Sequence, residues 1–169
     1  PDFVWIKNRP NANNHQLFDT VRGVDSSGDQ ALVSNATAAE STSNTNGGLS
    51  AINTDGFTLK AGTDSGSGRS NNTGSDAFTY VAWNWLAGTA FSNDASATGV
   101  GSIDSEGQVN TKAGFSIIKF TTDGETSGTV AHGLGVQPQL LIGKTRNHAV
   151  SWYVQSPLLA TNLSLILNA

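Results

Sequence analysis

Apolar residues along this chain fall into short runs that alternate with polar or small positions, and long polar stretches separate the runs. Residues 3–9 alternate between an aromatic or basic face and an apolar face, and residues 77–86 alternate with apolar side chains on both faces. A period of two, rich in β-branched and aromatic residues, is typical of β-strands. Because both faces of 77–86 are apolar, we predict that this strand is central and covered on both sides.

Turn-forming residues connect these runs into hairpins. Pro and Asn at 10–14 predict a turn between strand 3–9 and a second strand at 15–22, since Pro fixes φ and Asn tolerates a left-handed backbone. Asp55-Gly56 predicts a bend within 49–59, and Asp123-Gly124 predicts a hairpin between 115–121 and 128–131. Further strands are expected at 140–146, 151–155 and 163–167, with a tight corner at 132–135.

Polar and small residues dominate the segments between these runs. We expect long loops at 25–48, 61–76 and 87–107. Within the first of them, residues 35–40 contain fair helix formers preceded by residues that can cap a helix, so a short helical turn is predicted there. The pattern as a whole predicts an all-β, antiparallel fold with long polar loops.

The two ends of the chain resemble each other. A shift of 137 residues places Pro1, Lys7 and Arg9 on Pro138, Lys144 and Arg146, with matching apolar positions between them. We therefore expect a β-sandwich module at 1–137, and at 138–169 either the start of a second copy or strands that complete the sandwich. If 138–169 starts a second copy, that copy stops before the counterparts of 55–59 and 80–86, so we expect the chain to be a segment of a longer polypeptide.

Composition narrows the classes of function. Only 13% of the residues are charged and the net charge is −4, so no basic patch is available to bind a run of phosphates, and nucleic acid is not expected as a partner. The chain has no Cys, which excludes disulfides, thiolate metal sites and cysteine nucleophiles. No apolar stretch approaches the roughly 20 residues of a membrane helix, so membrane insertion is not expected.

Several blocks of the sequence, in their order, resemble a repeated domain of marine bacteriophage structural and tail-fibre-like proteins. These blocks are FVWIKNR (3–9), LFDTVRG (17–23), DGF (55–57), YVAWNW (80–85), GFSI (114–117) and HGLG (132–135). The resemblance implies an antiparallel β-sandwich of jelly-roll type, concanavalin-like or laminin-G-like, in a virion protein without enzymatic activity. It supplies no functional residues to carry over. Gly143 and Val154-Gln155 fit the first copy poorly, so the second copy is expected to pack differently.

Candidate chemistry is sparse. His15 and Asp19 lie four positions apart on one strand, but a catalytic triad requires a geometry that the sequence does not supply. We interpret His15 as a polar residue at a strand end and His132 as a partner for a backbone group, with His148 in a turn. We therefore expect no enzymatic activity, no cofactor and no metal.

One further set of side chains has the chemistry of a cation site. Asp94, Asp104 and Glu106 offer oxygen ligands for Ca²⁺ but lack the spacing of a dedicated loop.

Two kinds of residue could contact a ligand or partner. Tryptophan faces stack on sugar rings, but large aromatics in apolar strands are usually buried, so we predict that Trp83 and Trp85 belong mainly to the core. Binding residues concentrate on loops, which makes Arg69, Asn71 and Asn72 the candidate contact residues.

Three functions are compatible with these sequence features. We expect a virion structural module of a tail fibre or surface fibre, associated with other virion proteins and with copies of itself, as a trimer if fibrous. The alternatives are a carbohydrate-binding adhesin domain that recognises a host-surface glycan, and a capsid decoration protein. A polysaccharide depolymerase would require paired carboxylates in a cleft.

Overall fold

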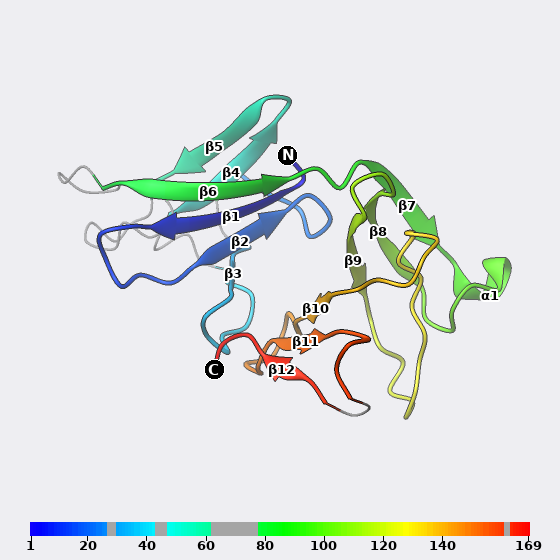
Figure 1. The fold of residues 1–169 in the computed structure, drawn as a ribbon. Helices are drawn as coiled ribbons and strands as arrows, with labels where there is room; N and C mark the ends of the chain where they lie inside the picture. The colour runs from blue at the N-terminus through cyan, green and yellow to red at the C-terminus, as the bar shows by residue number, and fades with distance from the viewer. Residues whose placement is uncertain (27–29, 43–46, 62–77, 161–162) are drawn as a thin grey trace.

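The computed structural model describes residues 1–26, 30–42, 47–61, 78–160 and 163–169, and these form an all-β, antiparallel, sandwich-like fold. The first sheet has the order β3-β2-β1-β6 (Figure 1). Its strands are β1 (Phe3–Asn8), β2 (Gln16–Asp19), β3 (Leu32–Val33) and β6 (Tyr80–Trp85). The predicted hairpin between the first two strands is confirmed.

The prediction that 77–86 forms a central strand is wrong. Among the residues that the structure describes, β6 pairs with β1 alone and lies at the edge of the first sheet. Its apolar character on both faces reflects two different environments: one face borders the core, and the other belongs to a partly exposed aromatic surface described below.

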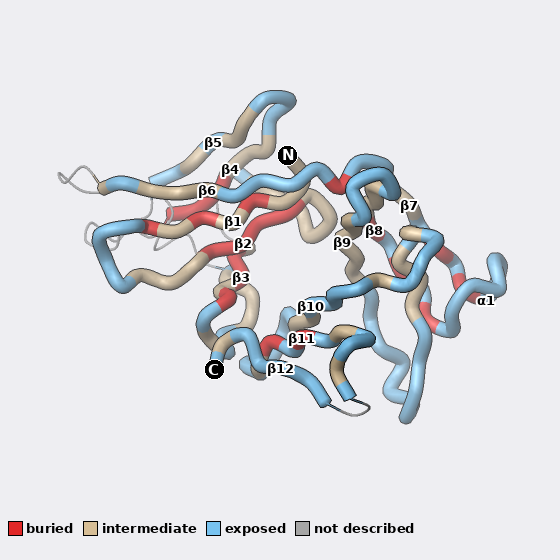
Figure 2. The backbone as a smooth tube through the Cα atoms, in the orientation of Figure 1, coloured by how far each residue is buried: buried red, intermediate tan, exposed pale blue. Residues whose placement is uncertain are grey.

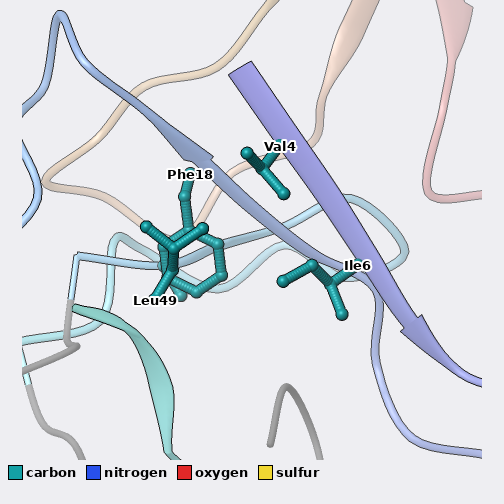
Figure 3. Packing of buried hydrophobic residues seen from close by; sticks show 5 residues of the cluster. Val4, Ile6, Phe18 and Leu49 are labelled. Carbon is teal, nitrogen blue, oxygen red and sulfur yellow. The ribbon is translucent and has the colours of Figure 1, made fainter. Parts of the chain in front are cut away.

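A two-stranded ribbon, β4 (Gly48–Asn53) and β5 (Gly56–Lys60), covers one face of the first sheet. The predicted bend is confirmed, because Asn53 pairs with Gly56 around residues 54–55. Figure 3 shows Val4 and Ile6 projecting from β1 toward Phe18 and Leu49, which are all nearly inaccessible to solvent. Burial of each such side chain stabilises the fold by about 1.5–3 kcal/mol, so this cluster is the main core.

The third sheet has the order β7-β8-β9 and replaces the loop predicted for 87–107. Its strands are β7 (Thr89–Asn93), β8 (Ser105–Asn110) and β9 (Phe115–Phe120), and the helical turn α1 (Ala95–Thr98) lies between the first two. The loop prediction failed because small residues, which are typical of loops, are required here by the close packing of neighbouring strands. A Cβ at Gly107 would run into the backbone carbonyl of Ile117 on the neighbouring strand.

The predicted hairpin between 115–121 and 128–131 is also wrong. β9 pairs with β8 around the turn 111–114, while Val130 makes an isolated parallel bridge to Ile103. Asp123-Gly124 does turn: Gly124 has φ +87°, and the Asp123 carboxylate accepts a hydrogen bond from the Glu125 N–H at 3.1 Å. Asp-Gly therefore predicted the turn correctly, but a turn of this kind does not require the two flanking segments to pair as strands.

The helical turn predicted for 35–40 is absent; residues 34–36 form a simple turn. Asn35 does not cap a helix there, because its side chain is used to join two loops. Its Oδ1 accepts from the His15 N–H at 2.9 Å, and its Nδ2 donates to the Asn14 side chain at 3.0 Å.

The C-terminal strands β10 (Leu141–Gly143), β11 (Tyr153–Gln155) and β12 (Leu165–Ile166) form a further three-stranded sheet, as the pattern predicted (Figure 1). The pairing of β10 with β11 reproduces that of β1 with β2 under the shift of 137, since Val4↔Phe18 becomes Leu141↔Gln155. Figure 2 shows that this sheet is much more exposed than β1, β2 and β4. The boundary at residue 137 stays a prediction.

Contacts through Trp152 and Arg146 join the C-terminal segment to the first sheet and to the segment that follows β3. The Trp152 indole N–H donates to the Val33 carbonyl at 2.7 Å, and its ring is buried against Leu17 and Leu32. The Glu40 carboxylate receives two hydrogen bonds from the Arg146 guanidinium, at 2.7 and 2.9 Å. No helix in the described part of the chain has the length and apolar character needed to cross a bilayer.

Candidate binding surface

Aromatic side chains line the face of the first sheet that points away from the main core. Period-two alternation places Phe3 and Trp5 of β1 on this face, and antiparallel pairing sets Trp85 and Trp83 of β6 opposite them. Phe115 reaches the same group from β9. We call these five residues the aromatic face.

The rings of the aromatic face contact one another in ordered geometries. Trp5 and Trp83 meet edge to face with centroids 6.0 Å apart, and Phe3 and Trp85 do so at 5.3 Å. Trp85 and Phe115 stack at 6.3 Å with an interplanar angle of 25°. Such pairs contribute about 0.5–1.5 kcal/mol each beyond burial, so they hold the rings in fixed orientations.

The prediction that Trp83 and Trp85 are mainly core residues is wrong, because their exposed fractions are 45% and 38%. Phe115 packs at one end of the aromatic face, and Trp152 packs on the first sheet at Leu17 and Leu32. Phe3 and Trp5 are partly buried against this cluster, so the accessible part of the face lies over Trp83 and Trp85 of β6. No described residue accepts a hydrogen bond from the indole N–H of Trp83 or Trp85, which leaves both donors available to a ligand.

His15 lies at the border of the aromatic face, just before β2, as its interpretation as a strand-end polar residue predicted. Its Nδ1 accepts a hydrogen bond from the Trp5 indole N–H at 2.9 Å, so the ring is neutral in this arrangement. Burial, and then the charge of Lys7, lower the pKa of His15. Asp19, which a triad would require as the partner of His15, instead binds the guanidinium of Arg22.

Lys7 occupies the next position of β1 on the same face as Trp5. Its Nζ donates to the backbone carbonyls of Asn8 and Asn11, the second at 2.8 Å. Both acceptors are neutral, so the charge of Lys7 remains available at the border of the aromatic face.

A second concave surface contains carboxylates from the third sheet and the loops around it. It is lined by Asp94, Asp104, Glu106, Asp123, Lys119, Arg146 and neighbouring residues. All four carboxylates already bind groups of the protein, Asp123 through the Glu125 N–H described above. Asp94 caps α1, accepting from Ser96 and Ala97, and these bonds lower its pKa; Asp104 accepts from the Ala95 N–H at 2.8 Å. Glu106 pairs with Lys119 at 3.1 Å.

These contacts concern the two functions considered for the acidic residues, which are glycoside hydrolysis and Ca²⁺ binding. A general acid for glycoside hydrolysis needs a raised pKa, and that of Asp94 moves in the opposite direction. Among the described residues, no group of three or more His, Asp or Glu side chains could hold a metal ion.

The remaining candidate residues from the sequence analysis are two histidines and three predicted contact residues. His132 accepts a hydrogen bond at Nδ1 from the Leu134 N–H at 3.2 Å, which confirms its interpretation as a partner of the backbone. His148 lies in a bend. Arg69, Asn71 and Asn72 lie outside the residues that the structure describes.

Sequence reasoning missed the aromatic face because it treated Trp83 and Trp85 as core residues. The alternation itself contained the signal. Once β1 and β6 pair, Trp5, Trp83 and Trp85 lie on one face of the sheet, and the buried Val4 and Ile6 lie on the other.

Fold and surface together define an all-β, antiparallel, sandwich-like domain that exposes an aromatic face. The chain belongs to the family described as "Domain of unknown function (DUF7483)", whose model matches residues 1–169. No curated protein and no solved structure gives a significant match.

Proposed function

We propose that this chain is a non-catalytic adhesive module that binds glycans through its aromatic face. The observation that carries the proposal is the exposure of Trp83 and Trp85 on a rigid sheet, where neighbouring rings fix their orientation. Apolar surface held open in this way favours ligand contact, and the apolar faces of pyranose rings suit flat indole rings. Unused indole N–H groups add hydrogen-bond donors for sugar hydroxyls.

The proposed setting is a bacteriophage particle, in a tail fibre or surface fibre. The ordered sequence blocks that resemble phage fibre-like proteins support this setting, and the low charge and abundance of Ser, Thr and Asn suit a hydrated outer surface. The partners would then be a host-surface glycan and other virion proteins. Antibody labelling of the particle in electron microscopy would distinguish a fibre from a capsid decoration protein.

The test is glycan binding by the chain and by two matched variants. The chain is screened on a glycan array, and affinities for the glycans retained are measured by isothermal titration calorimetry. Trp83→Ala should weaken binding at least tenfold, because aromatic anchors of this kind typically contribute about 2 kcal/mol or more. Tyr153→Ala, which removes a similarly exposed aromatic side chain from β11, should leave the affinity unchanged.

Two results would count against the adhesive function. The first is no binding to any glycan on the array. The second is an affinity that Trp83→Ala and Tyr153→Ala change equally, which would place the contact elsewhere.

A structural role within a fibre is the second candidate, and exposed apolar residues of the C-terminal sheet favour it. Leu141 is 49% exposed, whereas its counterpart Val4 is fully buried beneath β4 and β5. Tyr153 and Ile166 lie on the same face as Leu141. A face of this kind suits association with a second copy of the chain.

Sedimentation velocity at several protein concentrations tests this second candidate. We expect a mass that rises with concentration, to a trimer if the module is fibrous, and that falls to the monomer with Leu141→Lys. A monomer at every concentration would refute self-association.

A further inference from the structure

Basic side chains border the aromatic face at one end. Along β1, Trp5 and Lys7 point to the same side, and Arg9 continues the register because its N–H donates to the Thr79 carbonyl at 2.8 Å. The face therefore changes from aromatic to cationic along β1.

These cations have no acidic partner among the described residues. The ion pairs of the described part engage Arg22, Lys119 and Arg146, but neither Lys7 nor Arg9. Two of the three ammonium donors of Lys7 bind neutral carbonyls, and one is left. Acidic residues outnumber basic ones by 13 to 9, so two cations beside one another without an acidic partner are informative.

The cationic end and the rings are continuous. Lys7 acts electrostatically on His15, which binds the Trp5 indole, and Trp5 contacts Trp83. A ligand that stacks on Trp83 would therefore place its nearest substituent within reach of a positive charge.

From this arrangement we infer that the aromatic face selects acidic sugars: the pyranose ring of a uronic acid stacks on the indoles, and its carboxylate binds Lys7 and Arg9. The inference rests on the proposed function, which it narrows to uronate-containing polysaccharides. Opposite charges meet here at a partly exposed site, so the contribution is moderate and sensitive to salt.

The experiment compares sugars that differ only in the carboxylate. Oligomannuronate and oligogalacturonate are each titrated calorimetrically alongside their carboxyl-reduced, neutral forms. The chain should bind at least one acidic form about fivefold more tightly than its reduced form, and this preference should shrink as salt is raised. Lys7→Gln should reduce the preference, because it weakens binding of the acidic form more than binding of the reduced form. Lys112→Gln, at an exposed position of the turn 111–114, is the matched control and should retain the preference.

The possible outcomes distinguish selectivity for acidic sugars from glycan binding in general. Equal affinity for acidic and reduced forms, or binding only to neutral glycans on the array, would overturn the inference and leave glycan binding intact. A preference that survives Lys7→Gln would also overturn it. Failure to bind any glycan would overturn both.

Discussion

Removing the Trp152 side chain should undock the C-terminal sheet. Trp152 is 5% exposed, packs against Leu17 and Leu32, and donates a 2.7 Å hydrogen bond to the Val33 carbonyl. Trp152→Ala deletes the packing and leaves a cavity, a change that typically costs about 3–5 kcal/mol. Trp152→Phe keeps much of the ring but removes the donor, and should cost about 1–2 kcal/mol.

Urea unfolding followed by circular dichroism measures the free energy, and amide hydrogen exchange shows where protection is lost. Loss in Trp152→Ala should be greatest over residues 138–169, because Trp152 joins that segment to the first sheet. Trp83→Ala is the control, since its ring is 45% exposed and its loss should cost less than the loss of Trp152. If Trp152→Ala costs less than the control, or if protection falls evenly along the chain, the docking role assigned to Trp152 is wrong.

Three other changes test separate parts of the structure. Gly107→Ala should destabilise the third sheet by about 1–3 kcal/mol in urea unfolding, because the added methyl meets the Ile117 carbonyl; an unchanged midpoint would contradict this packing. Glu40→Gln removes the charge that both Arg146 and Arg22 bind and should cost about 1–3 kcal/mol, whereas equal stability would mean that water replaces these pairs. Because the pKa of His15 is lower in the folded chain than its ordinary 6.5, the unfolded chain binds the proton more readily, so stability should fall as pH drops through and below 6.5. His15→Gln should flatten that dependence in urea midpoints at pH 7.5 and 5.5, and an identical slope would assign the effect to another group.

Strands with large alternating side chains could be predicted from the sequence, since their pattern determines which face is buried. Residues 3–9 are the clearest case: Val4 and Ile6 are buried, and Phe3 and Trp5 are not fully covered. The strands at 89–93 and 105–110 could not, because most of their positions are polar or small and large apolar side chains do not alternate along them. Glycine is required at position 107 because a neighbouring strand passes close by, and that proximity is set by the tertiary structure.

The aromatic face illustrates the same limit for the candidate site. A strand that is apolar on both sides is compatible with a central position and with an edge position beside a binding surface. Pairing decides between them: β6 has one neighbour in the described part of the chain, and Trp83 stays partly exposed although its sequence context favours burial. The exposure of a large aromatic is therefore the property that sequence alone predicts least well here.

The two hairpins related by the shift of 137 residues show why a similar pattern need not bury the same face. β10 and β11 keep the register of β1 and β2, yet Gly143 stands where Ile6 fills the main core, and Gln155 stands where Phe18 does. Without those side chains, the corresponding face cannot form a comparable core. Burial moves to the opposite face, where Trp152 and Val154 lie on the side toward the first sheet. Because side chains alternate with period two, this reversal requires no change of register, only a change in which positions carry large apolar groups.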